Sequence, residues 1–105
     1  MLLTKELLKE FKKAGRQDWG LEETMVLAKF FHPFSSWTWY ATEYDPEDRI
    51  FYGLVDWIAL ERWSFSLVEF EQTKIHWLPF ERDRHWTPID AKTLTAKLEK
   101  ARGYY

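Results

Sequence analysis

The stretch from Phe34 to Asp48, FSSWTWYATEYDPED, joins an alternating aromatic run to a cluster of acids. Aromatic and β-branched residues at a period of two are typical of a half-buried strand, so we predict one over residues 37–44. Aromatic side chains bury roughly 150–250 Å² each, and such a strand therefore belongs in a sheet that other elements cover. The predicted strand carries Trp37, Trp39, Tyr40 and Tyr44, and the turn that ends it carries Glu43, Asp45, Glu47 and Asp48.

Further strands are predicted on both sides of this one. Residues 24–32 and 49–58 have the same β-branched and aromatic composition, and a fourth, shorter run lies at about 62–65. The connections HPFSS and DPED are short and rich in turn-forming residues. Because parallel neighbours need a long crossover, these short connections indicate an antiparallel meander.

Capping residues mark three helices, predicted at about 4–15, 66–72 and 90–103. Thr4 and Asp90 are good N-caps, and Ser66 with Glu69 three residues later matches a capping box. The polar stretch 16–23 is expected to be a loop anchored by Trp19. We therefore predict one α+β domain over residues 1–105, with an antiparallel meander of four to five strands and the N-terminal and C-terminal helices packed on one face.

The amino-acid composition excludes or disfavours several classes of function for this protein. The 105 residues include seven Trp, five Tyr and eight Phe, more rings than a small core can hide, so we expect some at the surface. A net charge of −2 disfavours a protein that tracks a nucleic-acid backbone. The absence of cysteine excludes disulfides, thiol catalysis and Cys-ligated zinc, and it is compatible with a reducing cytoplasm. We expect no membrane span and no targeting segment.

Five motifs follow one another along the chain, KFFHP, WTWYATEYD, GLV, FSLVEFE and ERD. Together they resemble a family of small bacterial proteins known as domain of unknown function 2958. The resemblance covers roughly residues 28–88 and departs from the pattern at Asp56, Trp57 and Ile58, which add bulk where the family usually returns to glycine. It implies a bacterial or phage origin on mobile DNA, and it implies no established activity, cofactor or catalytic residue. The matching positions are Lys29, Phe30, Phe31, Pro33, Trp37 to Tyr40, Glu43 to Asp45, Gly53 to Val55, Phe65 to Leu67, Glu69, Glu71 and Glu81 to Asp83.

Two alternatives to a binding module stay open from the residues alone. Glu43 and Asp45, with Glu81 and Asp83, could form a metal-dependent enzyme site, since divalent ions prefer oxygen ligands. An Asp-Pro turn needs no metal, however, because the Asp side chain caps its own backbone. The other alternative is single-stranded nucleic-acid binding by aromatic stacking, helped by Lys29, Arg62, Arg82 and Arg84.

The leading hypothesis is a non-enzymatic, cytoplasmic protein-interaction module without cofactor or metal, carried by a mobile element or phage. Its partner would be a host or element-encoded protein, and anti-CRISPR-like inhibition of host defence is the proposed specialisation. Tryptophan, tyrosine and arginine dominate interface hot spots, so an aromatic sheet face with an acidic rim is the expected binding surface. The candidate partner-binding residues are Trp37, Trp39, Tyr40, Glu43, Tyr44, Asp45, Glu47, Asp48, Trp57, Arg82, Asp83 and Trp86.

Overall fold

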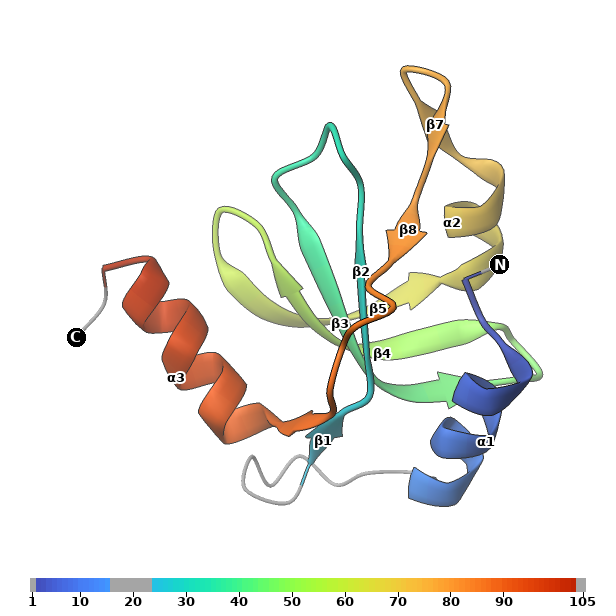
Figure 1. Cartoon of the computed structure of the whole chain (residues 1–105), viewed down its shortest axis with the longest axis horizontal. Helices are drawn as coiled ribbons and strands as arrows, with labels where there is room; N and C mark the ends of the chain where they lie inside the picture. The colour runs from blue at the N-terminus through green and yellow to red at the C-terminus, as the bar shows by residue number, and fades with distance from the viewer. Residues whose placement is uncertain (1, 16–23, 104–105) are drawn as a thin grey trace.

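A computed structural model describes residues 2–15 and 24–103 of the chain. The elements are α1 (Lys5–Ala14), β1 (Met25–Val26), β2 (Ala28–Phe31), β3 (Thr38–Asp45), β4 (Ile50–Asp56), β5 (Leu60–Ser66), α2 (Leu67–Gln72), β6 (Lys74–Ile75), β7 (Leu78–Pro79), β8 (Glu81–Arg82), β9 (Ile89–Asp90) and α3 (Ala91–Ala101). The expected loop around Trp19 lies outside the described residues. Figure 1 shows the strands at the centre and the helices around them.

The main sheet has five strands in the order β5-β4-β3-β2-β8. Every neighbouring pair in it is antiparallel, and β3, β4 and β5 follow one another as a meander. Two small antiparallel pairs, β1 with β9 and β6 with β7, lie outside it. The predicted α+β class with an antiparallel meander is therefore confirmed.

A bulge and a glycine bend the central hairpin. The register of β3 against β4 shifts between Ala41 and Glu43, so Thr42 lies in a β-bulge, where its hydroxyl donates to the carbonyl of Tyr52 at 3.1 Å. Gly53 lies at the same place, where a Cβ atom would fall 1.8 Å from the carbonyl oxygen of Tyr40. No other residue fits this close approach of two strands. The two strands consequently curve toward α1 (Figure 1).

The two faces of the sheet pack against different helices. Successive side chains of a strand point to opposite faces, and Trp39 and Tyr40 accordingly belong to two separate hydrophobic clusters. Phe11 of α1 packs in the cluster that contains Trp39, and Leu94 of α3 packs in the cluster that contains Tyr40. The arrangement thus differs in one respect from the expectation: α1 and α3 cover opposite faces rather than one face. Two covered faces hide more aromatic area than one.

The predicted N-caps are confirmed. The side chains of Thr4, Ser66 and Asp90 accept hydrogen bonds from backbone N–H groups three residues later. These bonds satisfy donors that the first turn of a helix leaves unpaired. Local chemistry therefore sets where all three described helices begin.

Candidate functional site

The candidate residues from the centre of the sheet lie in the interior. Trp39 and Tyr40 are buried, with exposed fractions of 8% and 5%. Tyr44 is half-buried against the cluster of α1, with its ring centroid 4.8 Å from that of Phe51. Trp86 is half-buried beside Tyr40, and its indole N–H donates to the carbonyl of Val26 at 3.0 Å. Trp39 and Tyr40 therefore belong to the core, and Tyr44 and Trp86 pack against it with part of their surface exposed.

The acidic cluster lies at the other end of β3 from Trp37 and has a local role. Oδ1 of Asp45 accepts hydrogen bonds from the backbone N–H groups of Glu47 at 2.9 Å and Asp48 at 3.3 Å. This geometry is the self-capping that an Asp-Pro turn favours. Glu47 and Asp48 are exposed, and Glu43 is half-buried. The rings at the start of β3 and the carboxylates at its end therefore do not form one continuous surface.

The second group of charged candidates is dispersed as well. Arg82 of β8 lies opposite Phe30 of the neighbouring strand β2. Oδ1 of Asp83 accepts a hydrogen bond from the backbone N–H of His85 at 2.9 Å. Glu81 lies in β8 and Asp83 follows it, whereas Glu43 and Asp45 lie two strands away on β3. Over residues 2–15 and 24–103, no group of three or more His, Asp or Glu side chains could hold a metal ion. The structure does not bring the four carboxylates together.

The exposed rings gather elsewhere, at one end of the sheet. The large hydrophobic residues with exposed side chains are Phe34 (62%), Tyr52 (39%), Ile58 (79%), Trp63 (43%), Trp77 (90%) and Leu78 (40%). All of these except Tyr52 belong to, or pack against, three segments: the β2–β3 loop (residues 32–37), the β4–β5 turn (57–59) and the β6–β7 hairpin. Figure 1 shows these three segments on the same side of the molecule, away from α1. We call this surface the aromatic end.

Three indoles form one half of the aromatic end. The ring centroid of Trp57 lies 5.1 Å from that of Trp37 and 5.6 Å from that of Trp63, and the latter pair is stacked. Trp37 and Trp63 are 6.4 Å apart. Ile58 follows Trp57 in the turn with its side chain exposed. We call Trp37, Trp57, Ile58 and Trp63 the tryptophan edge, because β5 is the outermost strand of the sheet.

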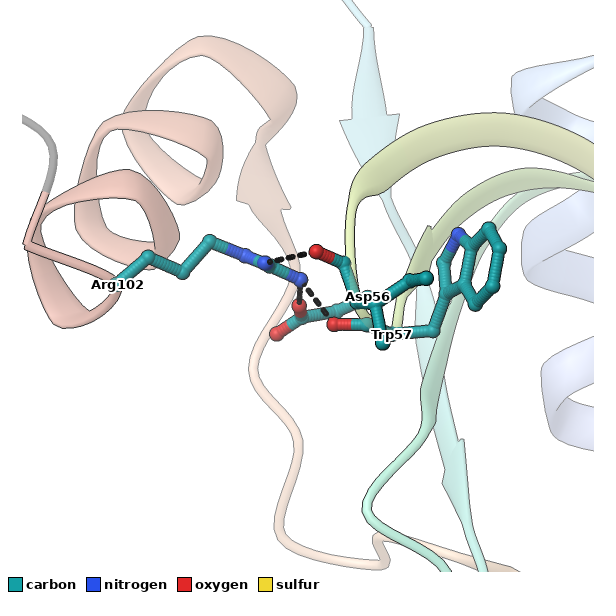
Figure 2. A network of polar contacts seen from close by, with 4 residues as sticks. Asp56, Trp57 and Arg102 are labelled. Atoms are coloured by element: carbon teal, nitrogen blue, oxygen red, sulfur yellow. Dashed lines mark hydrogen bonds and ion pairs between the residues drawn. The ribbon is translucent and has the colours of Figure 1, made fainter.

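Arg102 fixes the turn that carries two of these residues. Its guanidinium forms an ion pair with the carboxylate of Asp56 and donates to the carbonyls of Trp57 and Ile58 (Figure 2). Arg102 is the C-cap residue of α3, so the end of this helix is joined to the β4–β5 turn. Charge-assisted hydrogen bonds are stronger than neutral ones, and three acceptors hold the turn in one place.

The β6–β7 hairpin forms the other half of the aromatic end. Ile75 pairs with Leu78, which leaves His76 and Trp77 as a two-residue turn. Both have positive φ, 51° and 68°, as a type I′ turn requires. A bulky residue in this region is an outlier that costs of order 1–3 kcal/mol and is concentrated at functional sites. The chain thus holds an almost fully exposed indole at a strained position.

A buried histidine joins the β2–β3 loop to the β6–β7 hairpin. His32 is 2% exposed, and its Nε2 lies 2.8 Å from the carbonyl oxygen of Leu78. Its Nδ1 accepts the backbone N–H of Phe34 at 3.0 Å. A carbonyl can only accept, so Nε2 carries the proton. The Phe34 ring in turn lies 5.1 Å from that of His76, which couples the loop to the hairpin tip.

Three pKa shifts accompany this fold. Burial, and to a smaller extent the charge of Asp56, raises the pKa of Tyr40 to about 12. Burial also raises the pKa of Tyr44. Hydrogen bonds from Thr93 to the capping carboxylate lower the pKa of Asp90. All three shifts follow from packing or capping and suggest no acid–base chemistry.

Of the aromatic end, Trp37 and Trp57 are the two residues that the sequence predicts as partner-binding. Phe34, Ile58, Trp63, Trp77 and Leu78 were absent from the candidate site. The available signal was the pair Ile75 and Leu78 around a two-residue turn, which is the spacing of a tight hairpin. Because His-Trp replaces the usual Asn-Gly, the residue types of this turn do not indicate a hairpin.

Comparison with known proteins identifies a family and no activity. The family model described as "Protein of unknown function (DUF2958)" matches residues 2–104. No curated protein and no solved structure matches the chain. In the described part of the chain, no helix is long and apolar enough to cross a membrane.

Proposed function

Since this chain belongs to the DUF2958 family, whose description assigns no activity, we propose a function from its own surface: it is a non-enzymatic protein-interaction module that docks through the aromatic end. The binding surface would comprise the tryptophan edge together with Phe34, Trp77 and Leu78. Of the candidate residues from the sequence, Trp37 and Trp57 remain part of this surface.

One observation carries the proposal: among the described residues, every exposed large hydrophobic residue except Tyr52 lies on or packs against three segments at one end of the sheet. Scattered exposed apolar residues need no explanation, but a concentration of them is a mark of interaction sites. Tryptophan is also the residue type most enriched among interface hot spots. Trp77 supports the same conclusion, because its backbone conformation is unfavourable and its side chain is 90% exposed.

We propose a host or element-encoded protein as the partner. The family resemblance implies mobile DNA, and inhibition of a host defence system in the manner of anti-CRISPR proteins is the proposed specialisation. The protein is expected to act in the cytoplasm.

Site-specific photo-cross-linking tests this proposal in the full chain. A photoreactive phenylalanine analogue replaces Phe34 or Trp77 in one pair of proteins and Glu47 in a control, each expressed in bacterial cells that carry the mobile element. The aromatic-end positions should give a cross-linked protein band that is absent or weak for the control. An excess of the Trp77→Ser protein should compete poorly with the photoreactive protein for this partner. Equal cross-linking from both ends, or none from the aromatic end, would contradict the proposal.

A gel-shift experiment separates this function from single-stranded nucleic-acid binding. Exposed indoles can stack on bases, but the net charge of −2 offers little attraction to phosphates. We therefore expect no shift of single-stranded DNA or RNA oligonucleotides at ~50 mM salt. A shift that Trp77→Ser abolishes would assign the aromatic end to nucleic acid instead.

A further inference from the structure

The β5 strand is an exposed sheet edge. It spans seven residues, Leu60–Ser66, and pairs only with β4 among the described strands. Its central residues Arg62, Trp63 and Ser64 are all exposed, although successive side chains of a strand point to opposite faces. Exposure on both faces indicates that neighbouring elements leave this edge open. Such an edge presents alternate N–H and C=O groups that another strand can pair with.

The edge lacks several of the devices that usually prevent strand pairing. It contains neither proline nor lysine, and its register with β4 is regular over all seven residues. Natural sheets commonly protect long edges with proline, lysine or a bulge. The opposite edge is β8, which has only two residues. β5 is therefore the edge of this sheet that offers room for an added strand.

One face of the β5 edge combines an indole with a carboxylate. Glu61 and Trp63 are two residues apart and point to the same face, opposite Val55 and Gly53 of β4. The Trp63 ring stacks on Trp57 and lies at the rim of the tryptophan edge. Within the described residues, Glu61 forms no ion pair. A carboxylate beside an indole face suits a cationic side chain, since both groups attract positive charge.

We infer that β5 binds an extended segment of the partner by strand addition, and that this segment carries a lysine or arginine facing Trp63 and Glu61. Main-chain hydrogen bonds along β5 would supply affinity, and the indole with the carboxylate would supply selectivity for the basic residue. The inference rests on the proposed function in that the tryptophan edge is part of the aromatic end. It adds the conformation and the charge of the bound segment.

Blocked peptides provide the test with the intact protein. The probe is Thr-Val-Thr-Lys-Thr-Val-Thr, and the comparison peptide has Glu in place of Lys. Amide chemical shifts, followed by NMR at millimolar peptide, should change along β5 and not along β8. We expect the Lys peptide to bind about tenfold more tightly than the Glu peptide at low salt. This preference should shrink as salt screens the charges.

Two matched changes isolate the side chain and the backbone. Glu61→Gln should remove the preference for Lys over Glu, whereas Glu47→Gln, at the acidic turn, should leave it unchanged. Peptides N-methylated on one set of alternate amides should lose binding, and those methylated on the other set should retain it, because only one set points toward β5. Tolerance of both patterns would overturn strand addition, and equal affinity for the Lys and Glu peptides would overturn the charge assignment.

The outcomes also distinguish this inference from the proposed function. If a partner cross-links to the aromatic end but the peptides neither bind to β5 nor compete with that partner, strand addition is wrong and the interaction function stands. If the peptides bind to β5 while no partner cross-links, the partner proposal is wrong. A concentration-dependent dimer in sedimentation that Trp63→Ser dissolves would assign the edge to a second copy of the chain and overturn the inference.

Discussion

His32 donates a hydrogen bond from Nε2 to the carbonyl of Leu78, and this contact joins two segments that are far apart in the sequence. The same imidazole accepts the N–H of Phe34 through Nδ1. One buried side chain therefore positions both the β2–β3 loop and the β6–β7 hairpin. The aromatic end depends on this junction, because Phe34 and Leu78 are two of its exposed residues.

Replacing His32 with Phe should destabilise the protein by about 2–4 kcal/mol, since two backbone groups lose their partners in a part-buried site. His32→Asn keeps an acceptor near Phe34, and it should lose less. Urea titration gives the free energy of unfolding, and hydrogen exchange at the amide of Phe34 reports the local effect. Equal losses for the two variants would show that His32 acts only through packing.

At the tip of the β6–β7 hairpin, His76 and Trp77, we expect a conflict between the stability of the protein and its binding to the partner. The double change His76→Asn and Trp77→Gly installs the residues that type I′ turns favour. It should raise the free energy of unfolding by about 1–2 kcal/mol, because a non-glycine residue costs that much in the left-handed region. Loss of the ring contact between His76 and Phe34 offsets part of the gain.

Thermal and urea unfolding measure this gain in stability, and the yield of cross-linking to the partner measures the loss of binding. Trp77→Ala is the matched control, because it removes the indole but keeps the Cβ atom that makes positive φ unfavourable. The control should lose binding without becoming more stable. A double variant that is both more stable and fully able to bind would show that the exposed indole has no part in docking.

Local sequence predicts the helices and strands of this chain more closely than it predicts which side chains lie at the surface. Thr4, Ser66 and Asp90 cap their helices as predicted, because an N-cap involves residues only three positions apart. The central strands were also placed to within a few residues by their period-two pattern. The predicted strand at 24–32 is divided in the structure, since β1 pairs with β9 and β2 pairs with β3.

Burial of individual rings could not be predicted in the same way. Trp37, immediately before β3, and Trp39 within it both pack in the cluster of α1, yet only Trp39 is buried. The difference arises from Phe70 and Phe80, whose rings lie 5.1 and 5.4 Å from that of Trp39 and come from distant parts of the chain. No pattern within β3 contains this information. The same is true of the placement of α3 on the second face, which buries Tyr40.

Arg102 should be important for the shape of the tryptophan edge. Arg102→Ala removes an ion pair with Asp56 and two hydrogen bonds to the β4–β5 turn. We expect a loss of about 1.5–3 kcal/mol, the range for hydrogen bonds that involve a charged group. Exchange of the amide of Trp57, which donates to the carbonyl of Ala59 within the turn, should become faster.

Lys100→Ala, an exposed position on the same helix, is the control for helix propensity and should have little effect. If Arg102→Ala leaves both the free energy of unfolding and the exchange of the turn unchanged, α3 does not hold the turn. In that case the packing of Trp57 between Trp37 and Trp63 would be sufficient to position it.

Tyr40 makes stability depend on pH at the alkaline end. Burial raises its pKa to about 12, above the value of 10.0 for an exposed phenol. The Tyr40 phenol ionises at a lower pH in the unfolded chain than in the folded protein. The stability that Tyr40 contributes is therefore complete below pH 10 and is lost as pH rises toward 12. The loss should reach about 1 kcal/mol near pH 11. Urea titrations at about pH 8 and 11 measure it.

Tyr40→Phe separates this effect from that of the other tyrosines and lysines, which titrate in both proteins. The variant retains the ring that packs against Trp86 but has no phenol to ionise. It should therefore lose less stability than the wild type over the same pH interval, by about 1 kcal/mol. Identical losses in the two proteins would mean that the hydroxyl of Tyr40 reaches solvent and is not held in the cluster beneath α3.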